Sequence, residues 1–126
     1  MEMVKKDIEN RADVESLVNS FYQKVEKDDL IAHFFTRVVA VDWKKHLPIM
    51  YDFWESILLD QHNYHGSPMP KHISLNEKSP MTKAHFDRWL QLFSNNVDEL
   101  FAGPKAELAK TRALSISTVM RIKVIG

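Results

Sequence analysis

The chain has 126 residues, of which 44% are apolar and 27% are charged, as is usual for one globular domain. Lys plus Arg and Asp plus Glu balance at 17 each, so the charge gives no sign of a nucleic-acid-binding surface. The absence of cysteine excludes disulfides, thiolate nucleophiles, iron–sulfur clusters and thiolate zinc sites. The N-terminus is too charged for a signal peptide, and no apolar run approaches the ~20 residues of a membrane span. We therefore expect a single cytoplasmic domain over residues 1–126, with neither nucleic acid nor a membrane as a partner.

The spacing of apolar residues predicts helices along the chain, and no stretch alternates as a strand does. A first helix, capped by Asn10 or Asp13, is expected to run to about Lys27. Its apolar residues recur every three or four positions, as one buried face requires: Val14, Leu17, Val18, Phe21 and Val25. Residues 28–35 then predict a short turn of helix that starts at two aspartates.

A second long helix, capped by Asp42, is expected to run to about Leu59. Its apolar stripe is Trp43, Leu47, Met50, Phe53 or Trp54, Ile57 and Leu58. Pro48 falls near the first turns, where an interior proline costs about 3 kcal/mol unless the helix begins later than Asp42. Residues 60–70 hold one glycine and two prolines and are predicted as a loop.

The last third of the chain predicts two more long helices after one or two helical turns over residues 71–76. The Ser-Pro pair at 79–80 is typical of a cap and a first helical residue, so we expect a helix over residues 80–101. The Gly-Pro pair at 103–104 should end that helix and begin the last one. The buried positions of the last helix are expected to be Ala106, Ala109, Ala113, Ile116, Met120 and Val124. These elements predict an all-α domain.

Three rings with polar tips lie on or beside the apolar stripes. Tyr22 is at the edge of the first buried face, His46 shares a face with Met50, and Trp89 lies between two phenylalanines. All three should point inward, where their polar tips need hydrogen-bond partners. One interpretation is ordinary packing, with each tip bonded to a backbone carbonyl. The other is an apolar pocket whose donors meet a ligand.

His72 lies between a Gly/Pro-rich loop and a helix that starts with proline, beside apolar Ile73 and Leu75. Neutral imidazole is a good ligand for iron. A single histidine can hold haem iron where apolar contacts grip the rest of the porphyrin. The simpler interpretation is a loop histidine exposed to water, and local sequence alone leaves both open.

Two other constellations are weaker. His62, His65 and His72 have a spacing that zinc can use, but their Gly/Pro-rich segment offers no acidic partner in a fixed frame. Four carboxylates could be recruited for catalysis but are interpreted as solvated helix faces: Asp52, Glu55, Asp60 and Asp87.

Several stretches together resemble the truncated haemoglobins, the two-over-two helical globins, and most closely their third group. They occur in order over nearly the whole chain: Phe21–Val25, Phe34-Phe35, Trp43–His46, Phe53-Trp54, Pro70–His72 and Phe86–Phe93. The scarcity of glycine also fits, because the third group lacks the diglycine turns of the others. The resemblance implies a truncated globin-like two-over-two helical sandwich.

The resemblance also implies a haem b pocket in which His72 is the proximal iron ligand. Tyr22 and Trp89 match the distal residues whose O–H and N–H meet a ligand bound to iron. His46 matches the distal gate histidine. The other residues expected to bind the cofactor are Phe35, Met50, Phe53, Trp54, Lys71, Phe86 and Phe93.

The function implied is binding of O₂ and other diatomic ligands (NO, CO) at a five-coordinate haem iron. NO detoxification and peroxidase-like chemistry are the redox activities to consider, and both would need an unidentified reductase. We expect a monomer or a weak dimer. The alternative is a haem-free all-α interaction module. The chain departs from the family in a short connection between Phe35 and Trp43, in Pro48 and in Met50, which alter distal geometry.

Overall fold

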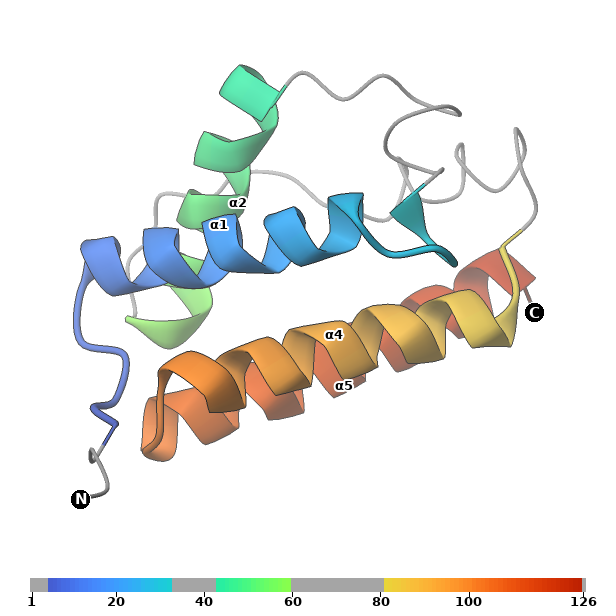
Figure 1. Cartoon of the computed structure of the whole chain (residues 1–126). Helices are drawn as coiled ribbons and strands as arrows, with labels where there is room; N and C mark the ends of the chain where they lie inside the picture. Colours follow the sequence, from blue (N-terminus) through green and yellow to red (C-terminus); the bar gives the residue numbers. More distant parts are fainter. Residues whose placement is uncertain (1–4, 33–42, 60–80, 126) are drawn as a thin grey trace.

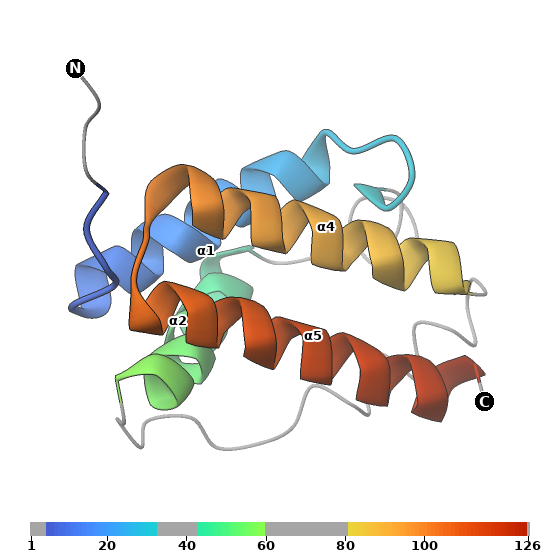
Figure 2. The ribbon, with the colours of Figure 1, turned by 90° about the horizontal axis from the view of Figure 1, so that it is seen from below.

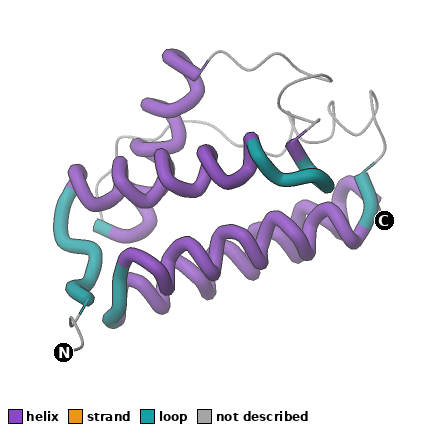
Figure 3. The backbone as a smooth tube through the Cα atoms, in the orientation of Figure 1, coloured by secondary structure: helices purple, strands orange, loops and turns teal. Residues whose placement is uncertain are grey.

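The computed structural model describes residues 5–32, 43–59 and 81–125, and within these ranges every regular element is helical (Figures 1 and 3). The helices are α1 (Arg11–Glu26), α2 (Trp43–Leu58), α4 (Lys83–Leu100) and α5 (Pro104–Ile125). Helices α4 and α5 run antiparallel as one layer (Figure 2). Helix α1 packs on α4, and α2 contacts both α1 and α5, so α1 and α2 form the second layer. No described helix has the length and apolar character to cross a membrane.

Helix α1 follows the sequence prediction closely. The side chain of Asn10 accepts a hydrogen bond from the Asp13 N–H at 3.0 Å, so Asn10 is the N-cap. Asp13 lies in the first turn, where its carboxylate accepts from the Glu9 N–H and from Lys6. The five apolar residues of the predicted stripe are all buried in the core. Their burial, at about 1.5–3 kcal/mol for each large side chain, holds α1 against the other helices.

Helix α2 begins at Trp43 and continues through Pro48, its sixth residue. The proline is therefore inside the helix rather than before it. Proline fixes φ near the helical value but has no N–H to donate to the preceding turn. Because Pro48 is exposed, the missing hydrogen bond lies on the surface side of α2. The expected cap at Asp42 lies outside the described residues.

Helix α4 begins at Lys83, three residues later than predicted, so the expected start at Pro80 is wrong. The N-cap is Thr82, whose backbone is extended and whose N–H donates to His85 Nδ1 at 2.9 Å. This bond, in which the side chain of the third helical residue accepts from the N–H of the cap residue, is one half of a capping box. The usual capping box has Glu or Gln at this position. A histidine there is not a recognised signal for a helix start, so the sequence pattern favours the Ser-Pro pair at 79–80 as the start of the helix.

The turn between α4 and α5 depends on Gly103, whose φ of +141° is open to glycine alone. A Cβ atom there would also lie 2.6 Å from Asp7 Cγ. The Asp7 carboxylate accepts from the N–H groups of Lys105 and Ala106 at 3.0 and 2.9 Å. Burial acts to raise the pKa of Asp7, but these bonds outweigh it and hold the pKa below its usual range. Asp7 thus satisfies the first turn of α5 at the predicted Gly-Pro boundary.

The two layers are joined by small and aromatic side chains. Ala106, Ala109 and Ala113 are buried on α5, where their size lets a neighbouring helix pack closely. Phe93 of α4 is stacked between two tryptophans: its ring centroid lies 4.7 Å from that of Trp54 and 5.7 Å from that of Trp89. This stack fixes α2 on α4 directly beside the cavity described below.

Two carboxylates interpreted as solvated are instead structural, which corrects that prediction. The Arg11 guanidinium lies 2.6 Å from an oxygen of Asp52, which is half-buried, and 3.0 Å from one of Glu55, which is buried. Arginine from α1 therefore neutralises two acids on α2. Asp87 is exposed as expected and pairs with Lys83 on its own helix, whereas Asp60 lies outside the described residues.

Candidate functional site

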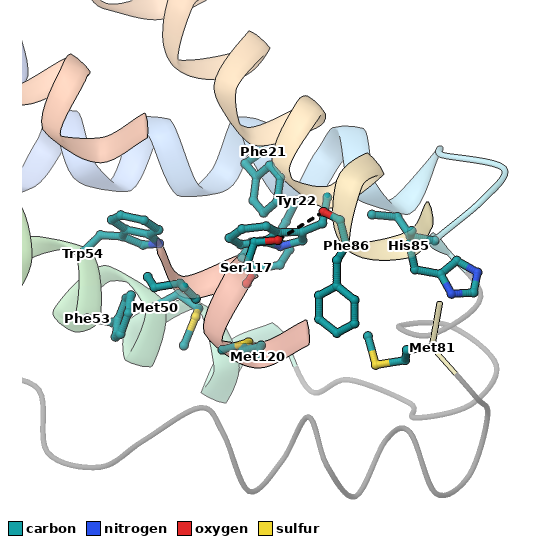
Figure 4. Close-up of a pocket in the computed structure, with 13 residues that line it drawn as sticks. Phe21, Tyr22, Met50, Phe53, Trp54, Met81, His85, Phe86, Ser117 and Met120 are labelled. Atoms are coloured by element: carbon teal, nitrogen blue, oxygen red, sulfur yellow. Dashed lines mark hydrogen bonds between the residues drawn. The ribbon is translucent and has the colours of Figure 1, made fainter. Parts of the chain in front are cut away.

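A cavity that is open to solvent lies between the two helical layers (Figure 4). Most of its wall is apolar, and the described lining residues with polar side-chain atoms are Tyr22, His85, Trp89 and Ser117. The lining comes from α1 and the turn after it, α2, the start and middle of α4, and α5: Phe21, Tyr22, Ile31, Met50, Phe53, Trp54, Met81, His85, Phe86, Trp89, Ile116, Ser117 and Met120. An apolar cavity with a few polar groups is the usual form of a small-molecule site.

Tyr22 lines this cavity from α1, as the sequence predicts. Its hydroxyl oxygen lies 3.2 Å from His46 Nε2. Burial raises the pKa of the Tyr22 hydroxyl above its usual range, because the phenolate would lose its hydration. The hydroxyl therefore keeps its proton at neutral pH and serves as a hydrogen-bond donor as well as an acceptor.

His46 approaches Tyr22 from the first half of α2 and is not among the cavity-lining residues. The two ring centroids are 5.3 Å apart, with the planes at 75°. When His46 Nε2 carries its proton, that N–H donates to the Tyr22 oxygen and the Tyr22 O–H can point into the cavity. Here the predicted gate histidine contacts the predicted distal tyrosine and is not among the residues that line the cavity.

Trp89 lines the cavity from α4, and its ring is fixed on two sides. It stacks on Phe93 with the planes at 13°, and it meets Phe21 edge-on at a centroid distance of 5.7 Å. Within the described part of the chain, its indole N–H donates to no other residue. Trp89 thus presents a donor in a fixed orientation at the cavity wall.

Four of the residues expected to contact the cofactor line the cavity: Met50, Phe53, Trp54 and Phe86. Phe93 is fully buried behind them, in the stack between the two tryptophans. His72, Lys71 and Phe35 lie outside the described residues, as do His62 and His65, the other two histidines of the zinc alternative. The structure therefore describes the Tyr22 and Trp89 side of the site, and the expected proximal ligand remains a prediction. The described residues contain no cluster of three His, Asp or Glu side chains that could bind a metal ion.

Sequence reasoning missed three polar or sulfur-containing members of the wall. Ser117 is buried on α5 and donates to the Phe86 carbonyl oxygen at 3.5 Å. Its place next to Ile116 and three residues before Met120 was a usable signal, because all three share the inner face of α5. Met81 and His85 line the cavity near the start of α4, which the sequence placed too early.

Comparison with known proteins agrees with this geometry. The profile of the bacterial-like globin family matches residues 6–123. The group 3 truncated haemoglobin of Campylobacter jejuni is 28% identical over 112 residues, which cover 86% of each chain. The crystal structure of a group III truncated haemoglobin from Campylobacter jejuni superposes with a TM-score of 0.82 at 27% identity, over 96% of this chain and 95% of that one.

These findings confirm the resemblance to group III truncated haemoglobins and the two-over-two fold. Globins are haem proteins that bind diatomic gases, so the family accounts for an apolar cavity with donors in its wall. A match of this length decides the family: the chain belongs to the bacterial-like globins.

Proposed function

We propose that this chain is a haem b protein that binds O₂, NO and CO at a five-coordinate iron, with His72 as the proximal ligand. The observation that carries the proposal is one cavity that combines apolar walls with two oriented groups, the Tyr22 hydroxyl and the Trp89 indole N–H. Family membership supports the cofactor, and the residue pattern around His72 supports the ligand.

The described wall fits a porphyrin. Met50, Phe53, Trp54 and Phe86 offer broad apolar surfaces, and a porphyrin carries several hundred Å² of apolar area. At about 25 cal/mol per Å², burying that area is worth on the order of 10 kcal/mol before the costs of association. When bound, haem supplies an iron that coordinates a diatomic gas reversibly and exchanges single electrons.

The two polar groups supply selectivity for the ligand. Tyr22 and Trp89 can each donate a hydrogen bond to a diatomic molecule in the cavity, whose wall is mostly apolar. Each such bond contributes roughly 1–3 kcal/mol in a site of low dielectric constant. Two bonds would slow the escape of O₂ by one to a few orders of magnitude.

Slow release suits chemistry or sensing better than delivery. Oxidation of nitric oxide to nitrate and reduction of peroxide are the two reactions that we propose to test first. Both need an electron donor, and the sequence lacks the glycine fingerprint of a dinucleotide site. We therefore propose that a separate reductase supplies the electrons.

An absorption spectrum tests the proposal directly. The purified chain should show a Soret band, a five-coordinate spectrum when reduced, and a sharp change on addition of CO. His72→Ala should lose the five-coordinate ferrous spectrum, because the proposal assigns the iron–imidazole bond to His72. The matched control is His65→Ala, which removes another histidine of the same Gly/Pro-rich segment and should leave that spectrum in place.

Two results would contradict the proposal. An unchanged ferrous spectrum in His72→Ala would exclude this ligand. A colourless chain that also refuses added hemin would exclude haem and leave the helical interaction module as the better interpretation.

A further inference from the structure

The aromatic rings of Tyr22, Trp43 and His46 form a cluster. The ring centroid of Trp43 lies 5.1 Å from that of Tyr22 and 5.7 Å from that of His46. Tyr22 and His46 complete the triangle at 5.3 Å. Of the three, Tyr22 lines the cavity (Figure 4). Trp43 and His46 are not among the lining residues.

The cluster joins the two helices of one layer. Tyr22 comes from α1, whereas Trp43 and His46 lie three residues apart on α2, where consecutive turns place side chains on one face. Trp43 meets the Tyr22 ring at 58° and the His46 ring at 73°. The first turn of α2 therefore contacts the Tyr22 side chain twice: Trp43 contacts its ring, and His46 contacts its hydroxyl.

Trp43 does not belong to the main core. The half-buried apolar residues that pack against the buried core include Leu47, Met50 and Tyr51 of the same helix, but not Trp43. Trp54 and Leu58 are the buried core residues of α2. Trp43 is a half-buried tryptophan that contacts both Tyr22 and His46, so it is placed to orient those two side chains.

We propose that Trp43 is a positioning residue for the distal site: it holds Tyr22 and His46 against each other and so directs the Tyr22 hydroxyl at a ligand in the cavity. The inference rests on the proposed function for the identity of that ligand. It adds a residue that touches neither the cavity nor the ligand. Its contribution should therefore be visible only through Tyr22.

The test compares Trp43→Leu with Trp43→Phe in the ferrous protein. Trp43→Leu removes the ring contacts and should raise the O₂ dissociation rate roughly 3- to 10-fold, in the direction of Tyr22→Phe, because the hydroxyl loses its fixed orientation. The C–O stretching band of the CO complex should move toward its position in Tyr22→Phe. Trp43→Phe keeps an aromatic face and should recover most of both values.

A double variant and a matched control separate orientation from packing. In Tyr22→Phe the further change Trp43→Leu should have little additional effect on O₂ release, since both act through one hydroxyl. Tyr51→Leu is the control, because Tyr51 also joins α2 to α1 without lining the cavity. Its hydroxyl donates to Asn19 Oδ1, and the Arg11 guanidinium lies over its ring. This variant should lower stability while leaving O₂ release and the C–O band unchanged.

The proposal is overturned if Trp43→Leu leaves the O₂ dissociation rate and the C–O band as in the wild type. It is also overturned if Tyr51→Leu changes them equally, since the effect would then be general. A chain without haem would contradict the proposed function instead. In that case the ring resonances of ¹³C-labelled Tyr22 still decide on Trp43: a shift in Trp43→Leu supports the orienting contact, and an unchanged spectrum excludes it.

Discussion

Asn96 and Trp89 are two polar-tipped residues of α4 that lie seven positions apart, about two helical turns, and both face α1. Asn96 is 0% exposed, and both ends of its amide are bonded: Nδ2 donates to the Leu17 carbonyl oxygen, and Oδ1 accepts from Ser20 and Lys24. Trp89 packs as firmly through its ring, yet within the described residues its N–H has no acceptor.

The difference distinguishes two uses of a polar group on one helix face. A buried polar atom without a partner loses about 1–3 kcal/mol, so the protein satisfies Asn96 completely where nothing else can enter. Trp89 lines the cavity, whereas Asn96 does not. A ligand in the cavity can therefore accept from the Trp89 N–H in place of a protein acceptor. We therefore expect Asn96 to serve stability, and we propose that Trp89 serves binding.

Trp89→Phe should have the largest effect of the variants that separate these two uses. Phenylalanine keeps the stack on Phe93 and the contact with Phe21 but deletes the indole N–H. One lost hydrogen bond of roughly 1–3 kcal/mol corresponds to an O₂ dissociation rate about 5- to 150-fold faster. Flash photolysis or stopped-flow mixing with the ferrous protein measures this rate.

The midpoint of urea unfolding should change little in Trp89→Phe, because the aromatic packing remains. An unchanged O₂ dissociation rate would show that the N–H does not meet the ligand, and the contrast with Asn96 would then have no functional meaning.

Asn96→Ala should show the opposite pattern. It removes the donor to the Leu17 carbonyl and the acceptor for Ser20 and Lys24, at a position without access to water. We expect a loss of about 2 kcal/mol or more in the free energy of unfolding, measured with urea on the CO complex, and an unchanged O₂ dissociation rate. The neighbouring Asn95→Ala is the control, since Asn95 is exposed and its loss should change neither quantity. Faster O₂ release in Asn96→Ala would mean that the two ends of α4 are coupled.

The sequence predicted the helices best where local signals agree. Asn10, the apolar stripe of α1 and the Gly-Pro boundary before α5 each depend on neighbours in the chain, and the structure confirms them. The predicted start of α4 is wrong because the N-cap, Thr82, donates its N–H to His85, which is not the Glu or Gln of the usual capping pattern. Glu55 was assigned to solvent because its partner, Arg11, lies 44 residues away and cannot be found from spacing.

The site divides in the same way. Tyr22 and Trp89 were identified from resemblance and from their places on apolar stripes, and both line the cavity. The role of Trp43 depends on the angle between α1 and α2, which periodicity does not determine. Ser117 shares its face of α5 with residues that were recognised as apolar, but a serine does not contribute to a hydrophobic pattern.

Asp28 extends the comparison of Asn96 with Trp89 to a charged group. Its replacement should have the smallest of the three effects: it should lower the free energy of unfolding by less than Asn96→Ala does. Its carboxylate is 2% exposed, lies 2.6 Å from Arg88 Nε, and accepts from the N–H groups of Leu30 and Ile31. Burial acts to raise the pKa of Asp28, but the guanidinium and the two N–H groups outweigh it and hold the pKa below its usual range. Arg88 directly precedes Trp89, so this pair anchors α4 beside the cavity without entering it.

A carboxyl whose pKa is lower in the folded state stabilises the fold fully above its unfolded pKa of about 3.9 and loses that contribution as the pH falls toward the folded pKa. Asp28→Asn should therefore be less stable than wild type at pH 7, by about 1 kcal/mol, and the difference should shrink below pH 4. Urea unfolding of the CO complex at both pH values measures it, with Asp98→Asn as the exposed carboxyl control. A difference that is constant with pH would show that the negative charge contributes nothing. An accompanying change in O₂ release would show that the anchor of α4 also sets the position of Trp89.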